Sequence, residues 1–360
     1  MRIAICSSGC HKTPPDGYGS EVTAWYMVEE LCKRGHEVWL FAAEGSRTPP
    51  NGKLFTMPLV IGSVMHEDAA AAGSLGELNS CDIVHDMSAR HTFADIAHES
   101  GHDKHLTTIN GISFITPRHK HNVVVGSEAA RYAALNGTPA WGDDYPQFHL
   151  PVGAAGRLPS CEVVNYGVDT NFFAASPSHD DYIIYLGRPH PAKGVHRIIE
   201  LAKLMSHQAF VLTWRAELPD HLWWEARYKE MARDVKNITI EVLPGPPEHH
   251  FRRRELYQRA KAFIQPTQYI EAFGITAIEA LSCGLPVILA DRGSAEEIVV
   301  QGETGFLCYD TMEEYTAAIG HVRVISRERC REDAVKRFDK GVMCERYLKL
   351  YERVLRGDEW

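Results

Sequence analysis

Two glutamates, Glu271 and Glu279, lie eight residues apart in a segment whose residue types suit a ligand site. Residues 275–282 have apolar side chains at helical spacing, and Gly284 follows where a left-handed helix cap is favoured. Since eight residues span little more than two helical turns, a Glu before the helix and a Glu within it can face one site. The alternative is a solvated Glu271 and an ordinary Glu279 on the helix face.

Two cations, Arg188 and Lys193, are a second set of candidates. They lie between an expected strand and an expected helix, where arginine offers a planar fork to phosphate oxygens and lysine a mobile point charge. Together they could hold a pyrophosphate and neutralise its charge as it leaves. Free amides at the start of the helix, around Phe273, Gly274 and Ile275, would favour the same group. The alternative is two surface cations near a turn.

The loop at residues 14–21 is a weaker candidate for a phosphate or an acceptor hydroxyl. Gly17 and Gly19 allow a ligand to approach the backbone closely, and Ser20 and Glu21 open the helix that follows. Any connection between a strand and a helix needs small residues and a cap, so this pattern is permissive by itself.

Strands and helices alternate along the chain in two successive series, which predicts two α/β domains with parallel sheets covered by helices. The first series has expected strands at residues 2–6, 37–42, 83–85, 105–109, 122–125 and 161–164 and a helix at 21–34. The second has expected strands at 182–186, 210–213, 238–243, 262–265 and 285–290 and helices at 195–205, 223–235, 255–260 and 275–282. Residues 169–180, rich in Ser, Pro and Ala, read as a linker.

The positions of these strands indicate which loops are expected to bind ligands. Ligands of doubly wound sheets lie beyond the carboxyl ends of the strands. The loops that follow Cys6, His85, Ile109, Leu186 and Gln265 are therefore the expected ligand loops.

Composition excludes several classes of function. The 360 residues are 44% hydrophobic and 24% charged, as in ordinary globular proteins, and the net charge of −9 argues against nucleic-acid or anionic-membrane binding. Nine cysteines without a Cys-x-x-Cys pair favour reduced thiols and a cytoplasmic location. Cys6 and Cys10, near a ligand loop, are either incidental or a redox or metal pair. The start is too short for a signal peptide, and no apolar stretch is long enough to span a bilayer.

Taken in order along the chain, these motifs resemble the retaining glycosyltransferase family 4 enzymes of GT-B architecture. The resemblance covers nearly the whole chain, and its motifs are the loop at 14–21, Lys33-Arg-Gly-His-Glu-Val38, Asp82-Ile-Val-His85, the segment 163–172, Leu186-Gly-Arg188, Lys193-Gly-Val195, the pair Glu271 and Glu279, and Gly302-Glu-Thr-Gly-Phe-Leu307.

The resemblance implies two Rossmann-like, doubly wound parallel-sheet domains facing a cleft. The acceptor-side domain would comprise residues 1–170 and the nucleotide-sugar-binding domain residues 171–340. A C-terminal helix within 341–360, expected near 342–355, would cross back to the first domain.

The resemblance also implies roles for residues. Glu271 would contact hydroxyls of the donor sugar and Glu279 the nucleotide ribose, while Arg188 and Lys193 would bind the pyrophosphate. The expected donor-binding residues are therefore Gly19, Arg188, Lys193, Glu271, Phe273, Gly274, Ile275 and Glu279, with Arg188, Lys193 and Glu271 as the catalytic set.

The expected reaction follows from this family and from charge. Cleavage of a sugar–phosphate bond leaves negative charge on the diphosphate, which preorganised cations and amides stabilise. No Asp-x-Asp motif is placed to clamp the phosphates through a metal, so transfer without a metal or other cofactor is expected. The leaving phosphate would take the acceptor proton, with retention at the anomeric carbon. UDP-glucose is the favoured donor, and GDP-mannose and UDP-N-acetylglucosamine stay open.

Three positions depart from the family pattern. Ser20 replaces a glycine, and Ala272 replaces a proline. Asn110 stands where many relatives carry a histidine, and an amide can form hydrogen bonds but cannot titrate. His85 and Asp86 are the nearest replacements, giving an acceptor-side set of Ser20, His85, Asp86 and Asn110. The alternative for His85 and Asp86 is a core-edge histidine and a loop cap.

Other interpretations stay open at this stage. Residues 248–254 are either a basic patch or a solvated polar face before a helix, and residues 223–233 either lie on a membrane or pack on the second sheet. Rival functions are nucleotide-sugar binding without catalysis and a GT-B epimerase or phosphorylase. The expected partners are the donor and an unidentified hydroxyl acceptor, and a homodimer is allowed.

Overall fold

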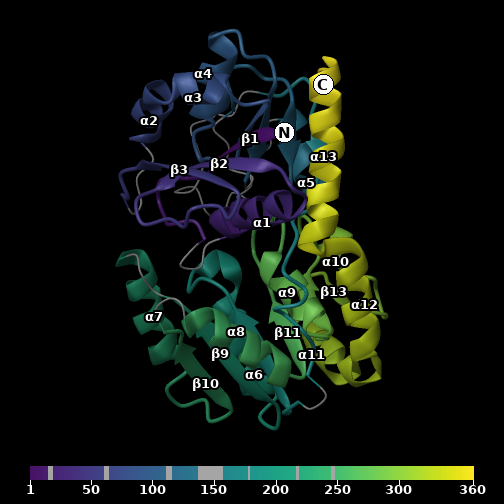
Figure 1. Ribbon diagram of the computed structural model, residues 1–360. Coiled ribbons are helices and arrows are strands. Elements are labelled where there is room, and N and C mark those ends of the chain that lie inside the picture. The colour runs from purple at the N-terminus through teal and green to yellow at the C-terminus, as the bar shows by residue number, and fades with distance from the viewer. Residues whose placement is uncertain are drawn as a thin grey trace. The chain divides into compact units, whose positions relative to one another are not determined.

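Two parallel sheets, each covered by its own helices, organise the chain (Figure 1). The computed structural model describes residues 1–14, 19–60, 65–110, 116–136, 157–176, 179–215, 219–244 and 248–360. Among these, residues up to 136, 157–167 and 340–360 form one unit, and residues 168–339 form the other. The chain thus passes between units at Gly167–Val168 and again at Asp339–Lys340.

The first unit has a seven-stranded sheet in the order β3-β2-β1-β4-β5-β6-β7. Its strands are β1 (Arg2–Cys6), β2 (Glu37–Ala43), β3 (Gly52–Met57), β4 (Ile83–Asp86), β5 (His105–Ile109), β6 (Val123–Val125) and β7 (Glu162–Val163). Its helices are α1 (Gly19–Lys33), α2 (Glu67–Gly73), α3 (Leu75–Asn79), α4 (Thr92–Glu99), α5 (Glu128–Asn136) and α13 (Lys340–Arg356). The strand order reverses between β1 and β4, as in doubly wound folds.

The second unit has a six-stranded sheet in the order β10-β9-β8-β11-β12-β13. Its strands are β8 (Tyr182–Leu186), β9 (Ala209–Trp214), β10 (Ile238–Val242), β11 (Ala262–Gln265), β12 (Val287–Ala290) and β13 (Gly305–Cys308). Its helices are α6 (Val195–Leu204), α7 (Pro219–Met231), α8 (Glu248–Arg259), α9 (Ile275–Ser282), α10 (Ala295–Ile298), α11 (Met312–His321) and α12 (Arg327–Phe338), with short 3₁₀ turns η2 (Pro191–Lys193) and η3 (Val322–Val324). The order reverses between β8 and β11.

Every strand expected from the sequence is present within two residues of its expected bounds. The sequence missed β3 and β13 because both carry partly exposed residues, which weakens the apolar signal. Helix α7 begins four residues before its expected start at 223. Helix α8 begins at Glu248, not at 255, so residues 248–254 do not precede a helix but form its first turns.

The last helix belongs to the core of the first unit. Figure 1 shows α13, at the yellow end of the chain, among the elements of the first unit. Its buried residues, including Met343, Tyr347 and Tyr351, pack in one cluster with apolar residues of β1, β2 and α1. The first domain is therefore completed only when the end of the chain has folded onto it.

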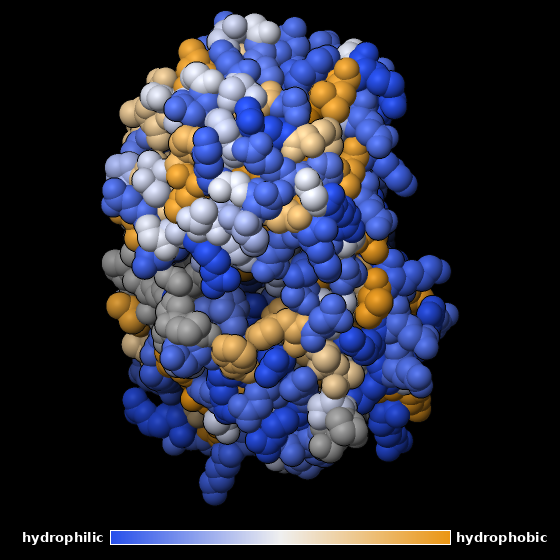
Figure 2. All heavy atoms as spheres, viewed as in Figure 1, coloured by the Kyte–Doolittle hydropathy of each residue, from blue (hydrophilic) through white to orange (hydrophobic). Residues whose placement is uncertain are grey.

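The aromatic helix α7 packs on the second sheet through part of its surface. Tyr228 is buried, and the Trp224 ring stacks on it with centroids 5.7 Å apart, whereas Trp223 is 60% exposed. Figure 2 shows a mostly hydrophilic face on which hydrophobic residues form small scattered patches. None of the helices in the described residues is both long enough and apolar enough to cross a bilayer.

Gly194 allows the loops after β8 and β11 to approach each other. Its φ of 75° lies in the left-handed region, and a Cβ added there would stand 1.9 Å from the carbonyl oxygen of Pro266. No side chain fits at that distance, so only glycine permits this contact.

Gly194→Ala is therefore expected to destabilise the second unit more than Gly302→Ala. Gly302 has a similar φ of 77° but no atom within 4 Å of an added Cβ. The control should lose about 1–2 kcal/mol, the cost of a left-handed non-glycine residue, and Gly194→Ala should lose more because a backbone must also move. Denaturant unfolding measures both free energies, and equal losses would contradict the steric account.

Candidate functional site

A pocket lies at the carboxyl ends of β11 and β12 in the second unit, the edge at which doubly wound sheets bind ligands. The loop after β8 joins it, because the Ala192 carbonyl accepts hydrogen bonds from the Gln268 amide at 2.7 Å and the Thr267 hydroxyl at 3.1 Å. The lining residues are Gln265, Thr267, Glu271, Gly274, Leu289, Ala290, Arg292, Ser294, Ala295 and Ile298.

Lys193 and Glu271 form an ion pair at this edge. Nζ of Lys193 lies 2.6 Å from Oε2 of Glu271, and the two side chains are only 12% and 16% exposed. The hydroxyl of Tyr269 donates to the same Oε2 at 2.6 Å and also contacts the Lys193 ammonium. The structure thus brings together two residues that the sequence proposed for one site, and it adds Tyr269, which the sequence analysis missed.

Burial is the main influence on the charges in this group. It lowers the pKa of the Lys193 ammonium, while Glu271 raises that pKa and Arg188 lowers it. Burial also raises the pKa of the Tyr269 phenol well above its ordinary value, with Glu271 adding to the shift. Tyr269 therefore remains a hydrogen-bond donor at neutral pH. A second anion near Lys193 would stabilise its charged form.

Arg188 is close enough to affect Lys193 and is still available for a ligand. The Tyr185 hydroxyl donates to the Arg188 carbonyl at 2.8 Å, which fixes the backbone. The side chain is exposed, and its guanidinium has no hydrogen bond or ion pair to any residue that the structure describes. Its planar fork is free to bind an anion.

The start of α9 offers less free backbone than the sequence suggested. Gly274 lines the pocket and is the N-cap of α9. Because glycine has no side chain, it offers no side-chain cap to the amides of the first turn. The Ile275 amide donates to the Phe273 carbonyl at 3.1 Å, and Phe273 is buried. Gly274 is therefore the part of this segment that faces the pocket, and the Ile275 amide is engaged in this structure.

The turn after β12 was missed by the sequence analysis. Gly293 has a φ of 63°, and an added Cβ would lie 2.3 Å from the Glu271 carbonyl oxygen, which accepts the Ser294 amide at 3.0 Å. Ser294 lines the pocket, and its hydroxyl is buried without a hydrogen-bond partner among the described residues. The strand before this turn was expected, so extending the carboxyl-end rule to residues 291–294 would have found it.

Glu279 has different partners from Glu271. It is buried within α9, where Arg253 donates to Oε1 at 2.7 Å and Tyr257 to Oε2 at 3.3 Å, both from α8. Burial raises the pKa of Glu279, and Arg253 opposes that shift. Only Glu271 of the two lines the pocket. In this structure, therefore, Glu279 joins α8 to α9.

In the first unit, His85 is a core residue. It is fully buried at the end of β4, with Nδ1 at 2.7 Å from the Tyr351 hydroxyl and Nε2 at 2.7 Å from the Thr108 hydroxyl. Burial lowers the pKa of His85 to about 3, so it is neutral at physiological pH. The core-edge interpretation of this histidine is the one that the structure supports.

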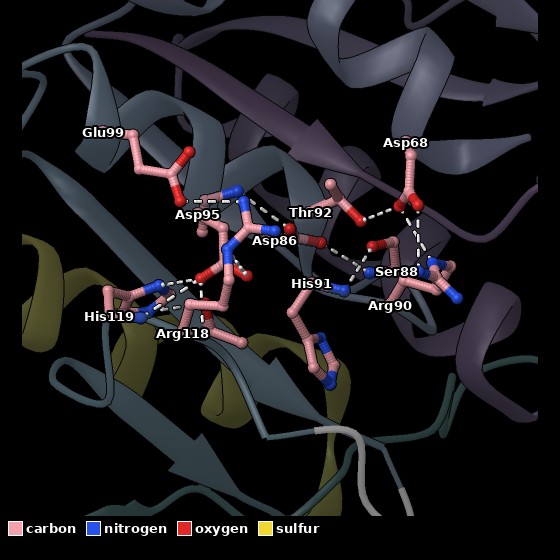
Figure 3. Close-up of polar contacts among 12 residues, drawn as sticks. Asp68, Asp86, Ser88, Arg90, His91, Thr92, Asp95, Glu99, Arg118 and His119 are labelled. Carbon is pink, nitrogen blue, oxygen red and sulfur yellow. Dashed lines mark hydrogen bonds and ion pairs between the residues drawn. The ribbon is translucent and has the colours of Figure 1, made fainter. Parts of the chain in front are cut away.

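Asp86 caps the loop after β4, and Asn110 lies close to that loop. The two carboxylate oxygens of Asp86 accept the amides of Ser88 and Ala94, each at 2.9 Å, within the polar network of Figure 3. Nδ2 of Asn110 donates to the Met87 carbonyl at 3.0 Å. Oδ1 of Asn110 is buried without a hydrogen-bond partner among the described residues. Of these two residues, Asn110 keeps an acceptor atom for a ligand.

Gly19 and Ser20 form the first turn of α1. Gly19 is exposed, and its carbonyl accepts the Thr23 hydroxyl at 2.8 Å. The Ser20 hydroxyl donates to Glu21 at 2.8 Å. The rest of the expected loop, residues 15–18, lies outside the described residues.

The second unit matches a known family. Residues 169–337 match the family described as "Glycosyl transferases group 1". A probable sucrose-phosphate synthase of Thermosipho melanesiensis is 28% identical over 200 residues, which are 52% of this chain and 45% of that protein. The chain thus spans less than half the length of this relative.

Solved structures resemble the whole chain. AviGT4, a glycosyltransferase involved in avilamycin A biosynthesis, is 20% identical with a TM-score of 0.72, covering 100% of this chain and 99% of its own. HepE of Anabaena in complex with UDP and glucose is 17% identical with a TM-score of 0.69, covering 98% and 99%. At these identities the likeness shows the fold, which is GT-B with two parallel-sheet domains.

The buried His85 gives a pH prediction. Below its ordinary pKa of about 6.5 the unfolded chain takes up a proton at this residue, whereas the folded chain does not until about pH 3. Lowering the pH from 7.5 to 5.5 therefore reduces the free energy of unfolding by about 1.4 kcal/mol through this residue.

His85→Gln should therefore lose about 1.4 kcal/mol less stability than the wild type over that interval. Denaturant unfolding at the two pH values measures the losses. His179→Gln, at an exposed position of the second unit, should behave as the wild type does. Equal losses in His85→Gln and wild type would contradict the burial of a neutral imidazole.

Proposed function

We propose that this chain, which matches group 1 glycosyl transferases over residues 169–337 and has the GT-B fold, transfers a sugar from a nucleoside diphosphate donor to an acceptor hydroxyl with retention. The observation that carries the proposal is the Lys193–Glu271 ion pair at the carboxyl-end pocket, with the free guanidinium of Arg188 beside it. A pyrophosphate needs such cations, and a sugar needs a carboxylate that accepts from its hydroxyls.

The two cations bind the diphosphate in this proposal. Arg188 donates two parallel hydrogen bonds to phosphate oxygens, and Lys193 turns from Glu271 towards the phosphate whose bond breaks. Because the Lys193 side chain is only 12% exposed, its ammonium attracts an arriving anion more strongly than a fully hydrated lysine would. Two preorganised cations supply the charge that a metal supplies in other transferases, so we assign transfer without a divalent metal.

The Glu271 carboxylate positions the donor. When Lys193 turns towards the phosphate, the Glu271 carboxylate becomes free to accept hydrogen bonds from hydroxyls of the sugar. The Tyr269 hydroxyl, which donates to Oε2, holds that carboxylate in place. Glu279 keeps its contacts with Arg253 and Tyr257 and so secures α9 against α8. The buried hydroxyl of Ser294 adds a polar partner inside the pocket.

The reaction step is a substitution on one face of the sugar. The bond from the anomeric carbon to the diphosphate oxygen breaks, and the acceptor oxygen bonds to that carbon from the same side. The acceptor proton passes to the departing phosphate oxygen, so no separate nucleophile is needed. Arg188 and Lys193 stabilise the negative charge that develops on that phosphate.

Donor and acceptor identities extend the proposal. UDP-glucose is the proposed donor, a choice supported by a neighbour of the same fold solved with UDP and glucose. On the acceptor side we assign Asn110, whose buried Oδ1 can accept from a hydroxyl, and Ser20 at the start of α1. His85 and Asp86 support that side from within the fold. Gly19, beside Ser20, is assigned to the donor phosphate.

Arg188→Ala and Lys193→Ala should each lower kcat/KM with UDP-glucose by about 10²–10³, the usual effect of removing one group that stabilises developing charge. Arg188→Ala should leave the melting temperature unchanged, because its guanidinium bonds no described residue. Transfer to a panel of sugar and polyol hydroxyls is measured by release of UDP.

Lys229→Ala is the matched control, since Lys229 forms an exposed ion pair with Glu225 at 2.6 Å on α7. It should keep wild-type turnover. Wild-type turnover in Lys193→Ala would overturn the site assignment. Donor binding without UDP release on any acceptor would instead favour a binding protein, and a free epimerised sugar would favour an epimerase.

A further inference from the structure

Three histidine side chains converge at the edge of the first sheet where its strands begin, opposite to the ligand edge. His98 lies in the last turn of α4, His105 is the first residue of β5, and His121 precedes β6 by two residues. Each offers one ring nitrogen, and these nitrogens all lie within 4.8 Å of one another. The ring centroids are 4.8–5.1 Å apart.

One nitrogen of each of the three rings lies close to the other two rings. Nδ1 of His121 lies 2.7 Å from the His119 carbonyl, which only accepts, so Nδ1 carries the hydrogen and Nε2 the lone pair. A metal-binding histidine usually donates its second nitrogen to a carbonyl in this way. Nδ1 of His98 and Nε2 of His105 are 3.3 Å apart and share a hydrogen bond, which a bound metal ion would replace. Two nitrogens of a tetrahedral zinc site, each about 2.05 Å from the ion, are separated by about 3.3 Å.

His119, although its ring is close by, is not a ligand. Its Nδ1 bonds Asp95 Oδ1 at 2.7 Å, and its Nε2 lies 3.2 Å from the Thr107 hydroxyl, so both nitrogens are engaged. Figure 3 shows His119 and Arg118 gathered around Asp95 of α4. This network fixes the segment that carries His121, and with it the His119 carbonyl that orients the His121 ring.

The backbone around His121 is held in an uncommon conformation. Lys120 and Asn122 both have positive φ, 57° and 53°, on either side of it. The side chain of Asn122 donates to the His105 carbonyl at 3.2 Å, which ties this turn to the start of β5. Such local strain persists where the surroundings over-determine it, and it clusters at functional sites. Here it turns His121 towards His105.

We propose that His98, His105 and His121 bind a Zn²⁺ ion. Imidazole nitrogen is a ligand that zinc favours, and three histidines with one further oxygen complete a tetrahedron. Asp103, whose Oδ1 lies 3.7 Å from Nδ1 of His98, or a water supplies that oxygen. The ion joins α4 to β5 and to the turn before β6. Its role is to stabilise the first unit, and it takes no part in sugar transfer.

Cobalt titration of protein without a histidine tag tests this site. Co²⁺ should bind with one equivalent and give the intense visible absorption of four-coordinate cobalt, and Zn²⁺ should displace it. His121→Ala and His98→Ala should each weaken Zn²⁺ binding by more than about a hundredfold, because even outer-shell partners contribute ten- to a hundredfold. His36→Ala, in the same unit but outside the cluster, should bind as the wild type does.

Thermal unfolding separates loss of the site from misfolding. Without metal, His121→Ala should melt close to the wild type, since its side chain is partly exposed. Added Zn²⁺ should raise the melting temperature of the wild type and of His36→Ala but not that of His121→Ala. Absence of the cobalt spectrum in the wild type, or equal zinc binding by wild type, His98→Ala and His121→Ala, would overturn the proposal.

Discussion

The buried ion pair between Lys193 and Glu271 is the interaction on which the candidate site depends. Two charges that are mostly withdrawn from water are tolerated only with good geometry and further hydrogen bonds, which Tyr269 provides. The pair also requires the loops after β8 and β11 to lie side by side. Gly194 permits that approach at Pro266, and Gly293 permits the next turn to approach the backbone of Glu271.

Glu271 and Glu279 show how burial can give two identical side chains different roles. Glu271 faces the pocket and shares its carboxylate with a lysine that an anionic ligand can draw away. Glu279 is enclosed by Arg253 and Tyr257 of α8, where leaving one partner unpaired would be costly. One carboxylate is therefore available for exchange with a ligand, while the other secures the helix that carries the site.

The first unit uses its buried histidines for structure. His85 connects β4 to the Thr108 hydroxyl of β5 and to Tyr351 of α13, the helix contributed by the end of the chain. The cluster of His98, His105 and His121 lies where β5 and β6 begin, away from the carboxyl ends that carry ligand chemistry in this fold. We therefore propose that the first unit uses one edge of its sheet for ligands and the opposite edge for cohesion.

Short apolar runs predicted the strands expected in the sequence analysis, and local motifs predicted that Arg188, Lys193 and Glu271 follow strand ends. Both kinds of signal depend only on a few consecutive residues, so the sequence alone contains them. The partners of Glu279, the buried state of His85 and the approach of Ser294 to the pocket depend on residues 22 to 266 positions away. No local pattern encodes such contacts. The sequence by itself determined the fold and the charged groups at its ligand edge, and only tertiary packing decided which of those groups stay open to a ligand.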